Sequence, residues 1–267
     1  MNTDRVDLSI LSERPSSLAM PRGRVIGAYL QEMRSEIVRY VRNPGFVLPT
    51  MLFPTVFYLM FGVFMASKNS ADASRYLLAA YGTFGVMAPG LFGFGVSLAM
   101  ERETGLLTLK RALPMPPFAY LLGKMVMAML ISAGVLTLLV LLATTLGHVS
   151  LTATQVATLY ATNVPGVLPF CALGLFIGTL VKGQAAPALI NLVYLPMAFL
   201  SGLWFPVTAL PKAVQMFAPL LPSYHLNALA LDAVGIFKVA ALPHVLFLAT
   251  FTALVSWIAA RRLRRIG

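Results

Sequence analysis

The hydrophobic pattern of this chain consists of long apolar runs separated by short polar segments. Residues 76–100 and 125–181 contain no Asp, Glu, Lys or Arg, whereas the segment between them, 101–124, is charged and broken by proline. A transmembrane helix needs about 20 apolar residues to cross the hydrocarbon core, so the second run is long enough for a hairpin of two helices. The pattern therefore predicts spans over 76–100, 125–146 and 154–180, with 101–124 as an aqueous loop.

Three further spans follow from the same reasoning. They cover 46–66, 185–205 and 239–260, and none of the three contains a charged residue. Between the last two, residues 206–235 are apolar but divided by four prolines into pieces of about ten residues, which is too short to span. These pieces predict an outer re-entrant helical hairpin, in which Ser223 is expected to cap the second helix.

The chain before the first span divides into two parts. Residues 1–23 are polar and contain two prolines, which predicts a loose cytoplasmic tail. Over 24–42, apolar residues recur at helical spacing with charged residues between them, which is typical of a helix lying in the membrane interface. A short soluble helix packed against the same chain is the alternative. The expected fold is an all-α membrane protein, with one domain over 24–267, six transmembrane helices and an interface helix.

Composition and charge agree with this class. Apolar residues make up 58% of the chain and charged residues 11%, against about 25% charged in soluble domains. The net charge of +11 is unevenly placed, because only four of the 20 Lys and Arg residues fall outside the predicted cytoplasmic side. Those four are Lys68, Arg75, Lys212 and Lys238. By the positive-inside rule, the sequence predicts a multi-pass protein of the inner (plasma) membrane with both termini cytoplasmic, and no nucleic-acid partner.

Catalytic motifs are missing. The sequence has no GxxxxGK[ST], HExxH or GxSxG motif, its one cysteine lies in an apolar run, and its three histidines are far apart. We therefore expect no enzyme activity, no metal site and no cofactor bound by this chain. None of the nine acidic residues lies inside a predicted span, which disfavours an ion-coupled secondary carrier. A non-transporting membrane anchor is the other alternative from a different class.

Two carboxylates lie at the end of a helix where a negative charge is unfavourable. Glu101 and Glu103 come at the carboxyl end of span 76–100, where the helix dipole opposes an anion by a few tenths of a kcal/mol. Cations of the same loop could offset them, or a basic groove on a partner protein could do so. Both interpretations remain open from the sequence. The cations concerned are Arg102, Lys110 and Arg111.

The charged loop and the outer hairpin resemble one known family. Residues 101–124 are similar to the segment E-x-E-x-G-T-L-E-x-L-x-x-T-P-x-x-x-x-x-x-x-G-K of the type-2 permeases of ATP-binding cassette (ABC) exporters. The sequence departs from the pattern at Leu107 and Thr108, where an acid is missing. FLSGLWFPVTALP and PLLPSYHLNAL resemble the end of span 5 and the outer hairpin of the same family. Matching or nearly matching positions in the loop are Glu101, Glu103, Gly105, Leu106, Pro114, Gly123 and Lys124.

The resemblance implies a half-transporter. Two copies of this chain, or this chain and a similar permease, would be driven by separate ATPase subunits that bind the ATP and Mg²⁺. The loop after the second span would act as a coupling helix, and the route would pass between spans 2 and 5, closed outside by the hairpin. The expected coupling residues are Glu101, Arg102, Glu103, Gly105, Lys110, Arg111 and Pro114. The expected outer gate consists of Pro206, Pro211, Pro222 and His225.

The cargo is suggested only by the polarity of the candidate path. Candidate path residues are Asn163, Asn191, Tyr194 and Phe199. Hydrogen bonds between helices are an alternative role for the two asparagines. A path without fixed charges suits a hydrophobic or amphiphilic compound, so we predict multidrug-like efflux of drug-like or lipid-like molecules, with membrane lipid as a further partner. Export of a polysaccharide or glycolipid by the same family is the alternative.

Overall fold

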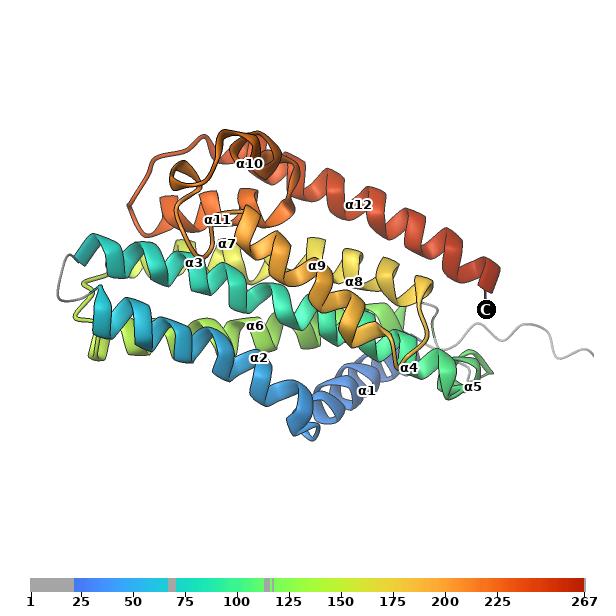
Figure 1. Cartoon of the computed structure of the whole chain (residues 1–267). Helices are drawn as coiled ribbons and strands as arrows, with labels where there is room; N and C mark the ends of the chain where they lie inside the picture. The colour runs from blue at the N-terminus through green and yellow to red at the C-terminus, as the bar shows by residue number, and fades with distance from the viewer. Residues whose placement is uncertain (1–21, 67–70, 113–115, 117, 267) are drawn as a thin grey trace, which may run out of the picture.

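The computed structural model describes residues 22–66, 71–112, 116 and 118–266, and every regular element among them is helical (Figure 1). This confirms the all-α class; the predicted tail, 1–23, lies almost wholly outside the described residues. The elements are α1 (Arg22–Val41), α2 (Pro44–Phe57), η2 (Tyr58–Met65), α3 (Ala71–Gly90), η3 (Leu91–Val96), α4 (Ser97–Glu103), α5 (Leu106–Ala112), α6 (Ala119–Thr145), α7 (Ala153–Asn163), η4 (Pro165–Val167), α8 (Leu168–Leu180), α9 (Ala186–Leu200), η5 (Val207–Ala209), α10 (Lys212–Phe217), η6 (Ala218–Leu220), α11 (Pro222–Ala233) and α12 (Ala241–Ile266).

Five helical stretches of the described chain are long and apolar enough to cross a membrane. They are Pro44–Met65, Asp72–Glu103, Ala119–Thr145, Ala153–Leu180 and Ala241–Arg265. Each of them overlaps one predicted span. The remaining predicted span, 185–205, contains the shorter helix α9. At 15 residues and about 1.5 Å per residue, α9 falls short of a ~30 Å core, so a sixth span stays a prediction.

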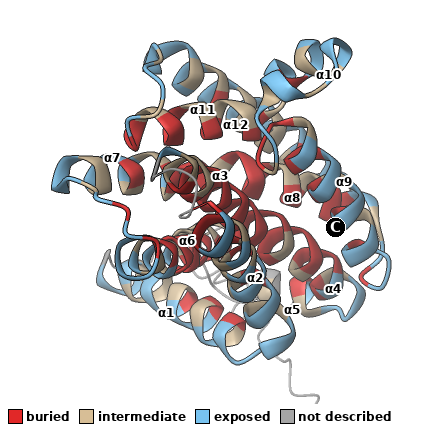
Figure 2. Cartoon of the chain, turned by 60° about the vertical axis from the view of Figure 1, so that its left-hand side comes forward, coloured by how far each residue is buried: buried red, intermediate tan, exposed pale blue. Residues whose placement is uncertain are grey.

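The stretch Asp72–Glu103 forms the centre of the molecule (Figure 2). In its most apolar window 83% of the residues are buried, against 6% for Ala241–Arg265. Its glycines let α8 approach closely: a Cβ added at Gly90 would lie 2.8 Å from the Cβ of Phe170, and one at Gly95 would lie 3.0 Å from the carbonyl oxygen of Gly174. These glycines therefore serve packing within one chain.

Helix α1 has one face packed against α6 and one face exposed. Tyr40 forms a small buried cluster with Met127 and Ile131 of α6. On the other face, Ile26 and Leu30 are each about three-fifths exposed. Exposed apolar side chains on a basic helix suit a membrane interface, although the interfacial position of α1 stays a prediction.

The outer segment 206–235 consists of short helices, as its prolines predict. Helix α11 packs against α3, α7 and α12, whereas α10 leaves Met216 and Phe217 exposed. The expected cap is wrong, because Leu221 occupies the N-cap of α11 and Ser223 lies inside the helix. The buried Ser223 hydroxyl instead hydrogen-bonds the hydroxyl of Ser201. Whether this hairpin re-enters a membrane stays a prediction.

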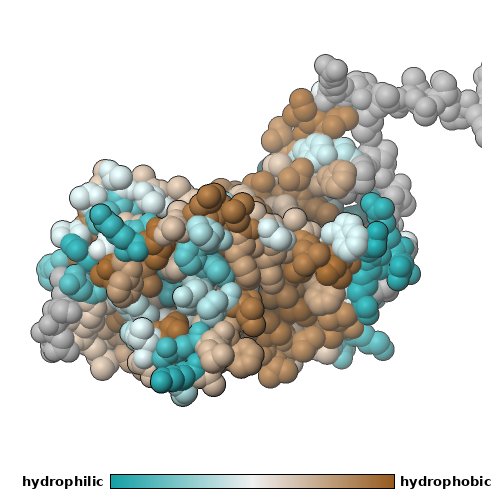
Figure 3. All heavy atoms as spheres, turned by 90° about the horizontal axis from the view of Figure 1, so that it is seen from above, coloured by the Kyte–Doolittle hydropathy of each residue, from teal (hydrophilic) through white to brown (hydrophobic). Residues whose placement is uncertain are grey.

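The surface has the polarity expected of a protein in a bilayer. Figure 3 shows a broad apolar area over the face seen from above, with hydrophilic residues gathered toward the ends. In Figure 1, α4, α5 and the carboxyl end of α12 lie at the same end of the helix bundle. This end carries the polar site described next.

Candidate functional site

A network of charged side chains joins four helices at the end of the bundle where α1, α4, α5 and α6 meet. Three carboxylates and three cations take part, so their formal charges cancel. Among the described residues, the members of this charge network are Glu32, Glu36 and Arg39 of α1, Glu101 of α4, Lys110 of α5 and Lys124 of α6.

Lys124 lies at the centre of the charge network and is fully buried. Its Nζ lies 3.0 Å from Oε2 of Glu36, 2.9 Å from Oε1 of Glu101 and 2.5 Å from Oγ of Ser97. A buried ammonium is strongly unfavourable unless opposite charges and hydrogen bonds compensate it. Since its three acceptors come from α1 and α4, Lys124 of α6 fixes these three helices to one another.

Glu101 is also buried, and the described chain itself satisfies its carboxylate. Besides Lys124, Nη1 of Arg39 lies 2.8 Å from Oε1. The Tyr120 hydroxyl donates to Oε2 at 2.7 Å, and the Ser97 hydroxyl donates to Oε1 at 2.8 Å. Glu101 is thus neutralised within the chain, but by Arg39 and Lys124 and not by the loop cations Arg102, Lys110 and Arg111 that the sequence suggested.

Lys110 ties the short helix α5 to α1. Its Nζ lies 2.5 Å from Oε1 of Glu32 and 2.8 Å from Oε1 of Glu36, and Arg39 forms a further ion pair with Glu36. Burial alone would raise the pKa of the Glu36 carboxyl, but the charges of Lys124, Arg39 and Lys110 outweigh it and lower that pKa to about 2. Glu36 is therefore an anion at neutral pH.

The cations expected to offset Glu101 are mostly engaged elsewhere. Arg102 donates from Nη1 to the carbonyl oxygen of Gly178 at 2.8 Å, which joins α4 to the end of α8. Lys110 bonds α1. The backbone of Arg111 belongs to α5, but its side chain and Pro114 lie outside the described residues.

The remaining loop residues form an exposed surface. Glu103 is exposed, and its carboxylate forms no hydrogen bond or ion pair with any residue that the structure describes. Gly105 adopts a positive φ of 75° after α4, a conformation that glycine reaches without strain. On α5, the Leu109 side chain is 61% exposed. The charge network thus holds α5 against α1, while the side chains of Glu103 and Leu109 remain exposed.

Six members of this site were not predicted from the sequence to have a role there: Glu32, Glu36, Arg39, Ser97, Tyr120 and Lys124. A signal was present in α1, where Glu32, Glu36 and Arg39 recur at intervals of four and three and therefore share one helix face. Lys124 matched the family pattern but carried no predicted role. Lys124 stands alone at the start of the charge-free run 125–181, and a lysine in such a place usually needs an anionic partner. This feature could have predicted its ion pairs.

The candidate path residues do not share one surface. Asn163 of α7 is buried, donates from Nδ2 to the Leu159 carbonyl at 3.1 Å, and leaves its Oδ1 without a partner among the described residues. Tyr194 is buried and donates to the Phe84 carbonyl at 3.1 Å. Asn191 and Phe199 lie on the exposed side of α9. Their role in a path stays a prediction.

The predicted gate residues also differ in their exposure. Pro206 and Pro211 are exposed and Pro222 is buried. Nδ1 of His225 lies 2.9 Å from Nδ1 of His244, and its Nε2 lies 2.8 Å from the Pro219 carbonyl oxygen. Because only an N–H can face a carbonyl, neutral His225 donates from Nε2 and accepts from His244.

This contact joins α11 to α12, so two of the histidines that are far apart in the sequence meet in the fold. No group of three His, Cys, Asp or Glu side chains suited to a metal ion occurs in the part of the chain that the structure describes. The gate role of His225 and the prolines is not tested by these contacts and stays a prediction.

Comparison with known proteins identifies the family. Residues 29–234 match the family model described as "ABC-2 type transporter", a range that includes the charge network, α5 and all of the outer segment except residue 235. The chain is also similar to the "Putative transport permease YvfS" of Bacillus subtilis (strain 168), with 28% identity over 197 residues, or 73% of this chain and 80% of that protein. The chain therefore belongs to the ABC-2 type transporter family, as a permease subunit.

Proposed function

We propose that this chain forms the membrane-spanning half of an ABC exporter that moves a hydrophobic or amphiphilic compound, drug-like or lipid-like, out of the cell. A separate ATPase subunit binds and hydrolyses the ATP. Two copies of the chain, or this chain and a similar permease, enclose the route. The protein crosses the inner (plasma) membrane six times and has both termini in the cytoplasm.

The charge network is the observation that carries this proposal. Lys110 bonds α5 to α1, and Lys124 bonds α6 to α1 and α4. Helix α4 ends the central span and α6 begins the next one. A partner that pushes α5 therefore moves the ends of two spans together, since the linked helices respond as one block.

The exposed face of the α4–α5 turn is the proposed docking surface for the ATPase. Glu103 supplies a carboxylate without a partner among the described side chains and Leu109 an apolar side chain, while Gly105 sets the turn between them. Buried Glu101 has a positioning role instead, because its carboxylate already serves Lys124 and Arg39. An apolar centre with charged neighbours is common in protein interfaces.

A cavity beside the charge network supports an amphiphilic cargo. Its volume is about 190 Å³, and it lies between α1, η3, α4 and α6. Its lining includes the charged residues Glu36, Arg39 and Glu101 together with the apolar residues Phe92 and Met127. A molecule with a polar end and an apolar body matches such a wall better than a uniformly polar sugar chain does.

The proposal is tested by isolating the chain from its native membrane in mild detergent and identifying its companions by mass spectrometry. We expect a stoichiometric protein that carries a GxxxxGK[ST] phosphate loop. If several detergents yield the chain without any such ATPase, the coupling role of α5 must be abandoned.

Disruption of the docking surface should separate the two subunits without unfolding the permease. For the double variant Glu103→Lys with Leu109→Asp, we expect at least tenfold weaker ATPase binding, roughly 1.4 kcal/mol, because both changed side chains are exposed. Binding is measured by titrating purified ATPase onto the permease in detergent.

The matched control makes equivalent changes at the other end of the bundle, Asp72→Lys with Leu146→Asp, where both side chains are also exposed. It should bind the ATPase as the unmodified chain does. Equal binding by the test variant and the control would exclude this face as the docking surface.

A further inference from the structure

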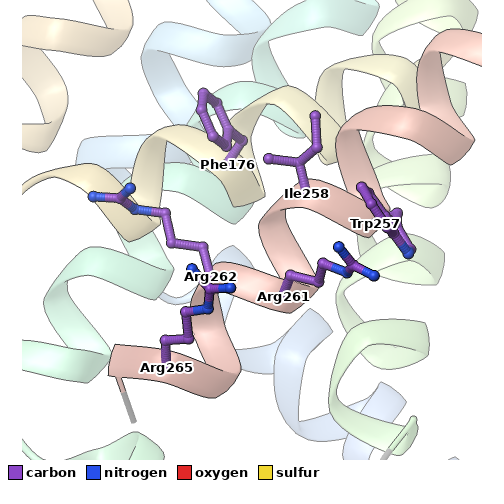
Figure 4. Close-up of a pocket in the computed structure, with 6 residues that line it drawn as sticks. All are labelled: Phe176, Trp257, Ile258, Arg261, Arg262 and Arg265. Atoms are coloured by element: carbon purple, nitrogen blue, oxygen red, sulfur yellow. The ribbon is translucent and has the colours of Figure 1, made fainter.

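We propose that the carboxyl end of α12 carries a binding site for the phosphate headgroup of an acidic phospholipid. The site is a pocket of about 450 Å³ between α12 and α8 (Figure 4). It is lined by Phe176 of α8 and by Trp257, Ile258, Arg261, Arg262 and Arg265 of α12. The inference goes beyond the transport function and requires only that α12 lies in a membrane.

The arginines of this headgroup pocket have no anionic partner in the described part of the chain. Arg261, Arg262 and Arg265 are exposed and form no ion pair or hydrogen bond there, in contrast to the cations of the charge network. Three nearby unneutralised guanidinium groups attract an anion. Arginine also matches phosphate geometry, because its planar fork can donate two parallel hydrogen bonds.

The arrangement of the pocket favours a phosphate over a diffuse counter-ion cloud. The guanidinium carbon of Arg261 lies 3.7 Å from the centre of the Trp257 ring, a cation–π contact that restricts this side chain. Figure 4 shows Arg262 extending away from Arg261, with Arg265 one turn further along. Arg262 and Arg265 can therefore donate to one bound group, while Arg261 stays beside Trp257 and adds positive charge to the pocket.

The apolar part of the pocket points to a lipid as the source of that phosphate. Trp257 is 52% exposed and Ile258 38% exposed, about one helical turn before the arginines. A tryptophan followed by basic residues is typical of the membrane–water boundary, and basic pockets between membrane helices bind acidic headgroups. Since α12 is the least buried of the candidate spans, acyl chains have free access to this side.

If the site exists, the chain should bind an acidic phospholipid more tightly than a zwitterionic one. The full chain in mild detergent is titrated with phosphatidylglycerol and, separately, with phosphatidylcholine, and bound lipid is counted by native mass spectrometry. We expect phosphatidylglycerol to bind at least about tenfold more tightly, and the double variant Arg262→Gln with Arg265→Gln to lose that preference.

The matched control also replaces two arginines by glutamine, but outside the pocket: Arg24→Gln with Arg264→Gln. Neither residue lines the pocket, and both are exposed. The control should keep the preference for phosphatidylglycerol. If the control loses as much of the preference for phosphatidylglycerol as the pocket variant does, general attraction between basic residues and acidic lipid explains the binding, and the proposal fails.

Inorganic phosphate distinguishes a lipid site from a site for a soluble anion. At millimolar concentration, inorganic phosphate should not displace phosphatidylglycerol, because it cannot use the apolar wall of Phe176 and Ile258. Full displacement would show a free-anion site and overturn the lipid assignment. Unchanged melting temperatures of both double variants without added lipid would confirm that the pocket variant is folded.

Discussion

Substitution of Lys124 by methionine is expected to destabilise the permease by about 3–5 kcal/mol. Methionine has a similar length but no charge, so the buried carboxylates of Glu36 and Glu101 would lose a cation. Removal of one partner from a buried set of charges leaves the others uncompensated, which is why the effect is large. The melting temperature of the purified chain in detergent measures it.

Two further variants show whether the charge balance is responsible. Lys182→Met removes an exposed lysine close to the end of α8 and should leave the melting temperature unchanged. Adding Glu101→Gln to Lys124→Met restores equal numbers of positive and negative charges, so it should recover part of the lost stability. A normal melting temperature for Lys124→Met alone would show that the charge network does not stabilise the fold.

A leucine at Gly174 is the second substitution with a large expected effect. A Cβ at this position would lie 2.7 Å from the carbonyl oxygen of Gly90 and 2.9 Å from that of Leu91. Both atoms belong to the backbone of the central span, so the helices must move apart rather than a side chain rotate. We expect a loss of about 3 kcal/mol or more, or failure to fold, since overpacking of this kind is poorly tolerated.

Gly27→Leu is the matched control for this substitution. A Cβ at Gly27 of α1 would meet nothing within 4 Å, so the same change should not reduce stability. Expression level and the melting temperature in detergent are compared for the two variants. Equal melting temperatures would contradict the close packing of α8 on the central span.

The spans could be predicted because a long run without charged residues is the main requirement for a helix that lies in hydrocarbon. Five of the predicted spans overlap the long apolar helices of the structure, and the prolines of 206–235 correctly indicated short helices. Helix α9 is shorter than its apolar run, because the chain leaves the helix at Ser201 and turns through Gly202 with φ of 81°. Hydropathy alone does not detect such a turn.

The contacts of the polar site were less accessible to prediction. Glu101 is paired with Arg39 and Lys124, which come from different helices on either side of it in the sequence. The helix dipole correctly indicated that the Glu101 carboxylate needs a compensating cation. The local spacing of charges, however, suggested partners within the same loop. Which helices meet is decided by tertiary packing, here by the close approach of α6 to α1 at Gly123, where an added Cβ would lie 3.2 Å from Cγ of Glu32.

The balance of three carboxylates against three cations in the charge network has an electrical consequence. One elementary charge that crosses a potential of 100 mV changes the free energy by about 2.3 kcal/mol. Because its own charges cancel, the charge network can shift relative to the bilayer with almost no such work. In any movement of these helices, the charge network itself should therefore contribute little gating charge, and voltage dependence would have to come from other charges of the chain.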